Sequence, residues 1–135
     1  MITRNIKQII IHCADTKVNQ SFDITDVDQW HKQRGFFMVG YHYYIKLDGT
    51  IQEGRNLEQV GAHCKGQNSD SIGICFEGGK NADGSKWDSP LSAQLDAWHT
   101  LYQYLCLMFG NLPLKGHYEY SEKSCPNFDI DEYLW

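Results

Sequence analysis

A short run of β-branched residues near the start of the chain constrains its fold most. Residues 8–13 read Gln-Ile-Ile-Ile-His-Cys, an apolar run of strand length rather than helix length. Such a run is typical of a buried strand in the centre of a sheet. His12 lies at its end, and open α/β sheets place their functional sites where strands end. The run therefore predicts a central strand that brings a histidine to a site.

A helix is predicted at residues 23–35. Acidic residues fall in its first turn and basic residues in its last, which complements the helix dipole, and Gly35 provides a stop. Ile24, Val27 and Trp30 recur at helical spacing, so we assign this stripe to the core.

The middle of the chain predicts more strands. Segments 40–47 and 50–52 flank Asp48-Gly49 and predict a β-hairpin, since Asp-Gly fits a two-residue turn with positive φ at both positions. Apolar residues alternate over residues 71–76, which predicts a further strand.

The longest predicted helix opens with Ser89 as its N-cap and Pro90 in its first turn, and Gly110 closes it. Strands and helices therefore interleave, and the predicted class is α/β: a single domain over residues 1–135, with a central mixed β-sheet flanked by α-helices. The predicted buried stripe of the long helix is Leu91, Leu95, Trp98, Tyr102, Leu105 and Phe109.

Charge and composition exclude several classes of protein. A net charge of −5 without any Lys/Arg cluster argues against nucleic acid as a partner. The first residues lack an apolar signal region and no stretch approaches a membrane span, so we expect cytoplasmic synthesis without a signal peptide and no membrane insertion. Five irregularly spaced cysteines suit a reducing compartment, and Cys75 and Cys106 are predicted to be buried.

Two histidines and a cysteine form a candidate metal site: His12, His117 and Cys125. Imidazole and thiolate are preferred zinc ligands, and three protein ligands leave a fourth position for water, as a hydrolytic site requires. Any one of these residues alone would more commonly be a buried core residue. Together, with Lys123 two residues before the cysteine, they favour zinc. Cys13 is predicted to point away, because neighbours on a strand face opposite sides.

Seven ordered motifs, spanning about residues 7–128, carry a family resemblance. The chain closely resembles type 2 N-acetylmuramoyl-L-alanine amidases, most nearly the small phage lysozyme-amidases, with animal peptidoglycan recognition proteins as more distant relatives. The motifs are Ile-Ile-Ile-His12-Cys-Ala-Asp-Thr, Trp30-His-Lys-Gln-Arg-Gly, Val39-Gly-Tyr41-His-Tyr-Tyr-Ile-Lys-Leu-Asp-Gly-Thr-Ile, Gly54-Arg55, Val60-Gly-Ala-His63-Cys-Lys-Gly-Gln-Asn68, Ser71-Ile-Gly-Ile-Cys and Cys125-Pro-Asn-Phe-Asp.

This resemblance implies a fold, a reaction and residue roles. One Zn²⁺ per chain would be bound by His12, His117 and Cys125, with Tyr41 and Lys123 as the catalytic residues. The implied reaction is hydrolysis of the amide between the lactyl group of N-acetylmuramic acid and L-alanine of the peptidoglycan stem peptide. Lys123 would stabilise the oxyanion that forms when water attacks the amide carbonyl, and Tyr41 would orient that water and exchange a proton with it.

The loop that contains His63 and Asn68 borders the substrate groove in relatives, so both are candidate substrate-binding residues. An equal alternative is that Asn68 only caps the loop. We expect His42 to be packed on the face opposite Tyr41, and His31 and His99 to be surface residues. Trp87 fits either sugar stacking or shielding of the helix start equally well.

The partner expected from the resemblance is peptidoglycan or a soluble muropeptide, bound by a monomer that reaches the cell wall after release or export. A non-catalytic binding protein is the competing class, but retention of Tyr41, Lys123 and Cys125 favours an enzyme. Some phage relatives also bind their phage's RNA polymerase, and nothing in this sequence tests such docking. A phage, prophage or bacterial origin stays open.

Overall fold

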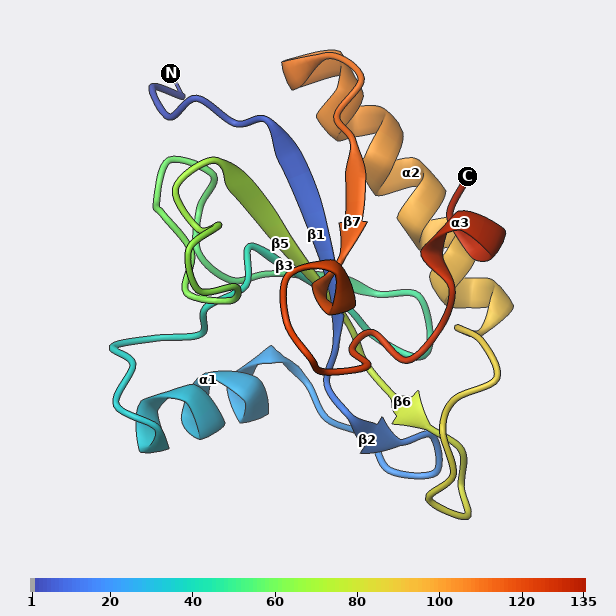
Figure 1. Ribbon diagram of the computed structural model, residues 1–135. Helices are drawn as coiled ribbons and strands as arrows, with labels where there is room; N and C mark the ends of the chain where they lie inside the picture. The colour runs from blue at the N-terminus through green and yellow to red at the C-terminus, as the bar shows by residue number, and fades with distance from the viewer. Residues whose placement is uncertain (1) are drawn as a thin grey trace.

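The computed structural model describes residues 2–135, built on one five-stranded sheet with helices on both sides (Figure 1). The strand order is β4-β3-β5-β1-β7. Only the β3–β4 pair is antiparallel among these neighbours, so the predicted mixed sheet is confirmed. The strands are β1 (Gln8–Cys13), β3 (Tyr43–Ile45), β4 (Ile51–Glu53), β5 (Ser71–Phe76) and β7 (Leu114–Gly116).

The remaining elements pack around this sheet. A small parallel pair, β2 (Thr16–Lys17) and β6 (Gly79–Lys80), extends from the ends of β1 and β5. The helices are α1 (Ile24–Gln33), α2 (Ser92–Phe109) and α3 (Ile130–Tyr133), with a 3-10 turn η1 (His117–Glu119) after β7. Within residues 2–135, no helix is both long and apolar enough to cross a membrane.

The isoleucine run forms a buried strand in the interior of the sheet, next to β5 at its centre. All six residues of β1 are buried, and β1 pairs in parallel with β5 on one side and β7 on the other. Ile9 and Ile11 pack in the larger core with Trp98 and Leu105 of α2. A smaller core contains Val27 of α1. Because strand residues alternate between faces, His12 lies on the face opposite Ile11 and away from α2.

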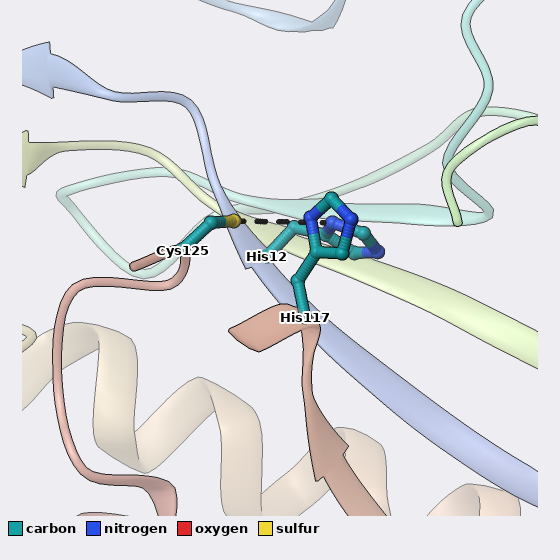
Figure 2. A group of neighbouring side chains, drawn as sticks. All are labelled: His12, His117 and Cys125. Carbon is teal, nitrogen blue, oxygen red and sulfur yellow. Dashed lines mark hydrogen bonds between the residues drawn. The ribbon is translucent and has the colours of Figure 1, made fainter. Parts of the chain in front are cut away.

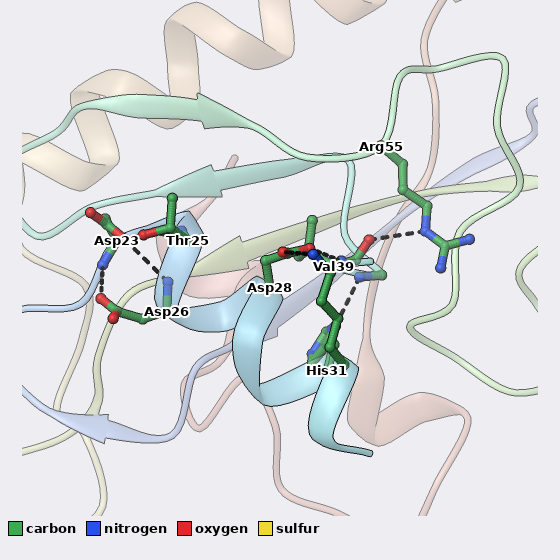
Figure 3. Close-up of polar contacts among 9 residues, drawn as sticks. Asp23, Thr25, Asp26, Asp28, His31, Val39 and Arg55 are labelled. Atoms are coloured by element: carbon green, nitrogen blue, oxygen red, sulfur yellow. Dashed lines mark hydrogen bonds and ion pairs between the residues drawn. The ribbon is translucent and has the colours of Figure 1, made fainter. Parts of the chain in front are cut away.

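Helix α1 begins as its sequence predicts. The Asp23 carboxylate accepts from the N–H groups of Thr25 at 3.0 Å and Asp26 at 3.2 Å, and Asp26 in turn accepts from the N–H of Asp23 at 2.9 Å (Figure 3). This reciprocal capping satisfies N–H groups that have no partner inside the helix. Gly35, with φ of +95°, follows the helix end. Val27 is buried, as predicted for the core stripe.

Helix α2 begins later than predicted. It starts at Ser92, and Leu91, the residue before it, is exposed rather than part of the core. The cause is Gln94, whose buried amide accepts from the N–H of Leu91 and donates to the carbonyls of Ile45 and Glu77. These bonds fix the helix start against the sheet. Gly110 ends the helix, as predicted.

The β3–β4 hairpin forms, but the prediction of positive φ at both turn residues is wrong. Gly49 has φ of +89°, whereas Asp48 is not among the residues with positive φ. The N–H of Gly49 donates to the carbonyl of Lys46 at 2.8 Å, and the N–H of Lys46 to the carbonyl of Thr50 at 2.9 Å. The connection is therefore longer than two residues, with glycine supplying the left-handed position.

Candidate active site

Strand pairing brings the two candidate histidine ligands together. Ile11 of β1 pairs with Gly116 of β7, and His12 and His117 are the next residue on each chain segment. Their ring centroids lie 4.6 Å apart. The third candidate, Cys125, comes from the loop after η1 (Figure 2). One donor atom from each residue lies within 4.8 Å of the other two, so the structure places the predicted set in one cluster.

Cys125 is held in place by backbone contacts. The N–H of Cys13 donates to Cys125 Sγ at 3.3 Å, and the N–H of Tyr118 donates to the Cys125 carbonyl at 2.9 Å. Contact with the Cys13 thiol, and then with His117 and His12, lowers the pKa of Cys125, so its thiolate is favoured at neutral pH. Cys13 is outside the donor cluster, as predicted, but the prediction that it points away is wrong in one respect: its thiol contacts Cys125.

His12 is buried, and both of its ring nitrogens have defined neighbours. Nδ1 lies 3.9 Å from Cys125 Sγ, and Nε2 lies 2.9 Å from Nδ1 of His63. Burial lowers the pKa of both His12 and His63 and so favours their neutral rings. A neutral ring is what metal ligation by His12 requires. A zinc-bound histidine normally has its other nitrogen held by a neighbouring group. Two imidazoles and one thiolate in this arrangement fit a zinc ion with an open fourth position.

Tyr41 contacts this cluster from the end of the segment before β3. Its ring centroid lies 5.1 Å from that of His12. Burial raises the pKa of its hydroxyl well above the usual value, so the group stays protonated. The neighbouring His42 is fully buried on another side, where its Nδ1 accepts from the N–H of Gly73 at 3.0 Å. The predicted packing role of His42 is thus confirmed.

His31 is not the surface residue that we predicted. It is buried, its ring centroid lies 5.2 Å from that of Tyr41, and its Nδ1 accepts from the N–H of Gly40 at 2.8 Å (Figure 3). Burial lowers its pKa to about 4. The available signal was its position four residues after Val27, on the buried face of α1. His99 is exposed, as predicted.

Lys123 is an exposed residue of the loop between His117 and Cys125. Asn68 holds the loop that carries His63, because its Oδ1 accepts from the N–H groups of His63 at 3.0 Å and Cys64 at 2.9 Å. Trp87 is buried against Phe128, which favours shielding over sugar stacking.

All seven predicted site residues line one groove of about 820 Å³. Aromatic and basic side chains make up more of its wall, including Phe36, Tyr120, Arg34 and Lys65. The predicted set is His12, Tyr41, His63, Asn68, His117, Lys123 and Cys125.

Comparison with known proteins identifies the family. The family model described as N-acetylmuramoyl-L-alanine amidase matches residues 2–128. The chain therefore belongs to this family, which confirms the resemblance, and it is an enzyme of the amidase class.

Particular relatives agree with this assignment. The endolysin of Escherichia phage T7 is 40% identical over 123 residues, covering 90% of this chain and 81% of the relative. The N-acetylmuramoyl-L-alanine amidase LysC from Clostridium intestinale superposes with a TM-score of 0.83 at 32% identity, covering 96% of this chain and 83% of LysC. The complex of peptidoglycan recognition proteins LCa and LCx with tracheal cytotoxin gives a TM-score of 0.80 at 27% identity, covering 93% and 78%.

Proposed function

We propose that this chain hydrolyses, with zinc, the amide between the lactyl group of N-acetylmuramic acid and L-alanine of the stem peptide. The observation that carries this proposal is the convergence of His12, His117 and Cys125 in the wall of the groove. Two neutral imidazoles and one thiolate would give a zinc site a net charge of about +1. When bound, zinc would polarise the scissile carbonyl and acidify a water molecule.

The protein's own groups supply the remaining chemistry. Tyr41 keeps its proton, and its ring lies beside His12, so its hydroxyl would orient the attacking water and exchange a proton with it. Lys123 lies in the loop that also carries Cys125, so its ammonium group would stabilise the oxyanion that develops on the carbonyl.

Substrate contacts would come from the groove loop that carries His63 and Asn68. The Oδ1 of Asn68 is used by the loop, which leaves its amide NH₂ to bind a stem peptide or lactyl oxygen. His63 would contribute the ring edge that lines the groove.

We further propose that residues 1–135 act as one monomeric domain on wall peptidoglycan or a soluble muropeptide. Nucleic acid is not an expected partner at a net charge of −5. Docking on a polymerase, as in some phage relatives, would use surface outside this groove.

Metal removal tests this function. Chelation should abolish release of stem peptides from purified peptidoglycan, and added zinc should restore it. The fold should survive, because the main core is built largely from residues of the sheet and α2, and none of these core residues belongs to the donor cluster. Full activity in metal-free protein would contradict the proposal, and complete loss of far-UV circular dichroism on chelation would recast the metal as structural.

A further inference from the structure

A chain of hydrogen bonds runs behind His12, away from the candidate metal position. His12 Nε2 lies 2.9 Å from His63 Nδ1, and His63 Nε2 lies 3.2 Å from Ser71 Oγ. The Ser71 hydroxyl donates to the carbonyl of Gln67 at 2.7 Å. His12 is 1% exposed and Ser71 is fully buried, whereas His63 between them is partly exposed. His12 and Ser71 therefore depend on their neighbours rather than on bulk water for their hydrogen bonds.

The end of the chain at Ser71 fixes the direction of every proton. A serine hydroxyl has one hydrogen, and here it points at the Gln67 carbonyl. Towards His63 the Ser71 oxygen can only accept, so the Nε2 of His63 carries a hydrogen. The Nδ1 of a neutral His63 is then an acceptor, and the hydrogen between the two rings belongs to the Nε2 of His12.

The candidate metal end leads to the same assignment independently. His12 Nδ1 faces Cys125 Sγ at 3.9 Å, in the cluster of donors. A nitrogen that ligates a metal carries no hydrogen, so a neutral His12 must carry its hydrogen on Nε2. Both ends therefore require the same tautomer.

The backbone makes room for this arrangement. A Cβ built on Gly73 would lie 2.6 Å from Cγ and Cδ2 of His63, and one built on Gly61 would lie 2.6 Å from Cδ2. Neither glycine is among the residues with positive φ, so glycine is required at these positions by space and not by conformation. The Oδ1 of Asn68 also accepts a hydrogen bond from the backbone N–H of His63, at a distance of 3.0 Å.

We propose that His63 and Ser71 are positioning residues that hold His12 in its Nε2–H tautomer, so that the Nδ1 lone pair faces the site before a metal arrives. This inference rests on the zinc site of the proposed function. In this arrangement both ring nitrogens of His63 are used in hydrogen bonds to His12 and Ser71, so neither is free to bind substrate. Loss of a group that orients a ligating histidine typically weakens metal binding by about 10–100-fold.

The tautomer of His12 is measurable in metal-free protein without any substitution. Long-range ¹H–¹⁵N correlation spectra of ¹⁵N-labelled protein distinguish the two neutral forms by the shifts of the ring nitrogens. We expect His12 and His63 both to carry hydrogen on Nε2. A His12 ring with its hydrogen on Nδ1, or an even mixture, would overturn the proposal.

Zinc titration of variants tests the role of each link. Ser71→Ala should weaken zinc binding by about tenfold or more and mix the His12 tautomers. The matched control is Ser69→Ala, at an exposed serine two residues before Ser71. His63→Ala should weaken binding further, whereas His63→Asn, which keeps an acceptor near His12, should recover part of it. Wild-type zinc affinity in both Ser71→Ala and folded His63→Ala would contradict the proposal.

These measurements separate the inference from the reaction. If His12 carries its hydrogen on Nε2 but the protein cuts no wall amide, the proposed function is wrong and the tautomer assignment holds. If the protein is an active amidase but His12 carries its hydrogen on Nδ1, the tautomer assignment is wrong and the proposed function holds.

Discussion

The backbone N–H of Cys13 donates to the Sγ of Cys125 at 3.3 Å. Strand β1 thus supplies one candidate ligand, His12, and its next residue, Cys13, donates a hydrogen bond to a second candidate ligand, Cys125. A thiolate that accepts such a bond is stabilised in its charged form. Strand β1 therefore positions one candidate ligand and helps to hold the thiolate of another.

Cys125→Ser should remove most of the bound zinc, because a serine hydroxyl is a far weaker zinc donor than a thiolate. Elemental analysis of purified protein would measure this loss. Cys106→Ser is the matched control, since Cys106 lies on α2 outside the groove and should keep about one zinc per chain. Full zinc in Cys125→Ser would show that the ligand assignment is wrong.

Lys123→Ala should slow amide hydrolysis by about two to three orders of magnitude with zinc still bound, because the charge that stabilises the oxyanion is lost. Lys86→Ala, at an exposed lysine outside the groove, should leave the rate unchanged. An unaltered rate in Lys123→Ala, measured on the same muropeptide, would exclude the catalytic role.

Tyr41→Phe should cause a loss of similar size, about two to three orders of magnitude, because it deletes the proton-transfer group and keeps the ring. Tyr104→Phe, at an exposed tyrosine on α2, serves as the control. Single-turnover rates and zinc content should be measured together. A rate within a factor of a few of the wild type would remove the hydroxyl from the mechanism.

The metal-free protein should lose stability as the pH falls from about 6.5 towards 4. Burial lowers the pKa of His31 and of His42 to about 4 in the folded protein, whereas the unfolded chain takes up these protons near pH 6.5. The unfolded state therefore binds more protons in this range, and unfolding becomes easier on acidification.

Urea denaturation of metal-free protein at several pH values would measure this effect. His31→Gln should reduce the slope of stability against pH, and His99→Gln, at an exposed histidine, should not. A flat profile in the wild type between pH 6.5 and 4.5 would contradict the burial argument.

Local patterns in the sequence were sufficient to predict the main strands, helix α1 and the donor set His12, His117 and Cys125, whereas the roles of Tyr41, His63 and Asn68 came from the family resemblance. The features that sequence reasoning missed depend on contacts between distant segments. Gln94 sets the start of α2 through the carbonyls of Ile45 and Glu77, and the Cys13 thiol meets Cys125 across 112 positions of chain. His31 was misplaced because its partners, Gly40 and Tyr41, lie beyond the helix that carries it.

The identity of the bond that is cut distinguishes an amidase from an enzyme that cleaves the sugar chain. Purified peptidoglycan digested with the zinc-loaded protein should be labelled in parallel for new amino groups and new reducing sugar ends. Free L-alanine amino termini should appear with wild-type protein and not with Cys125→Ser, and no new reducing ends should form. New reducing ends without new amino groups would show cleavage of a sugar linkage and would contradict amide hydrolysis by this protein.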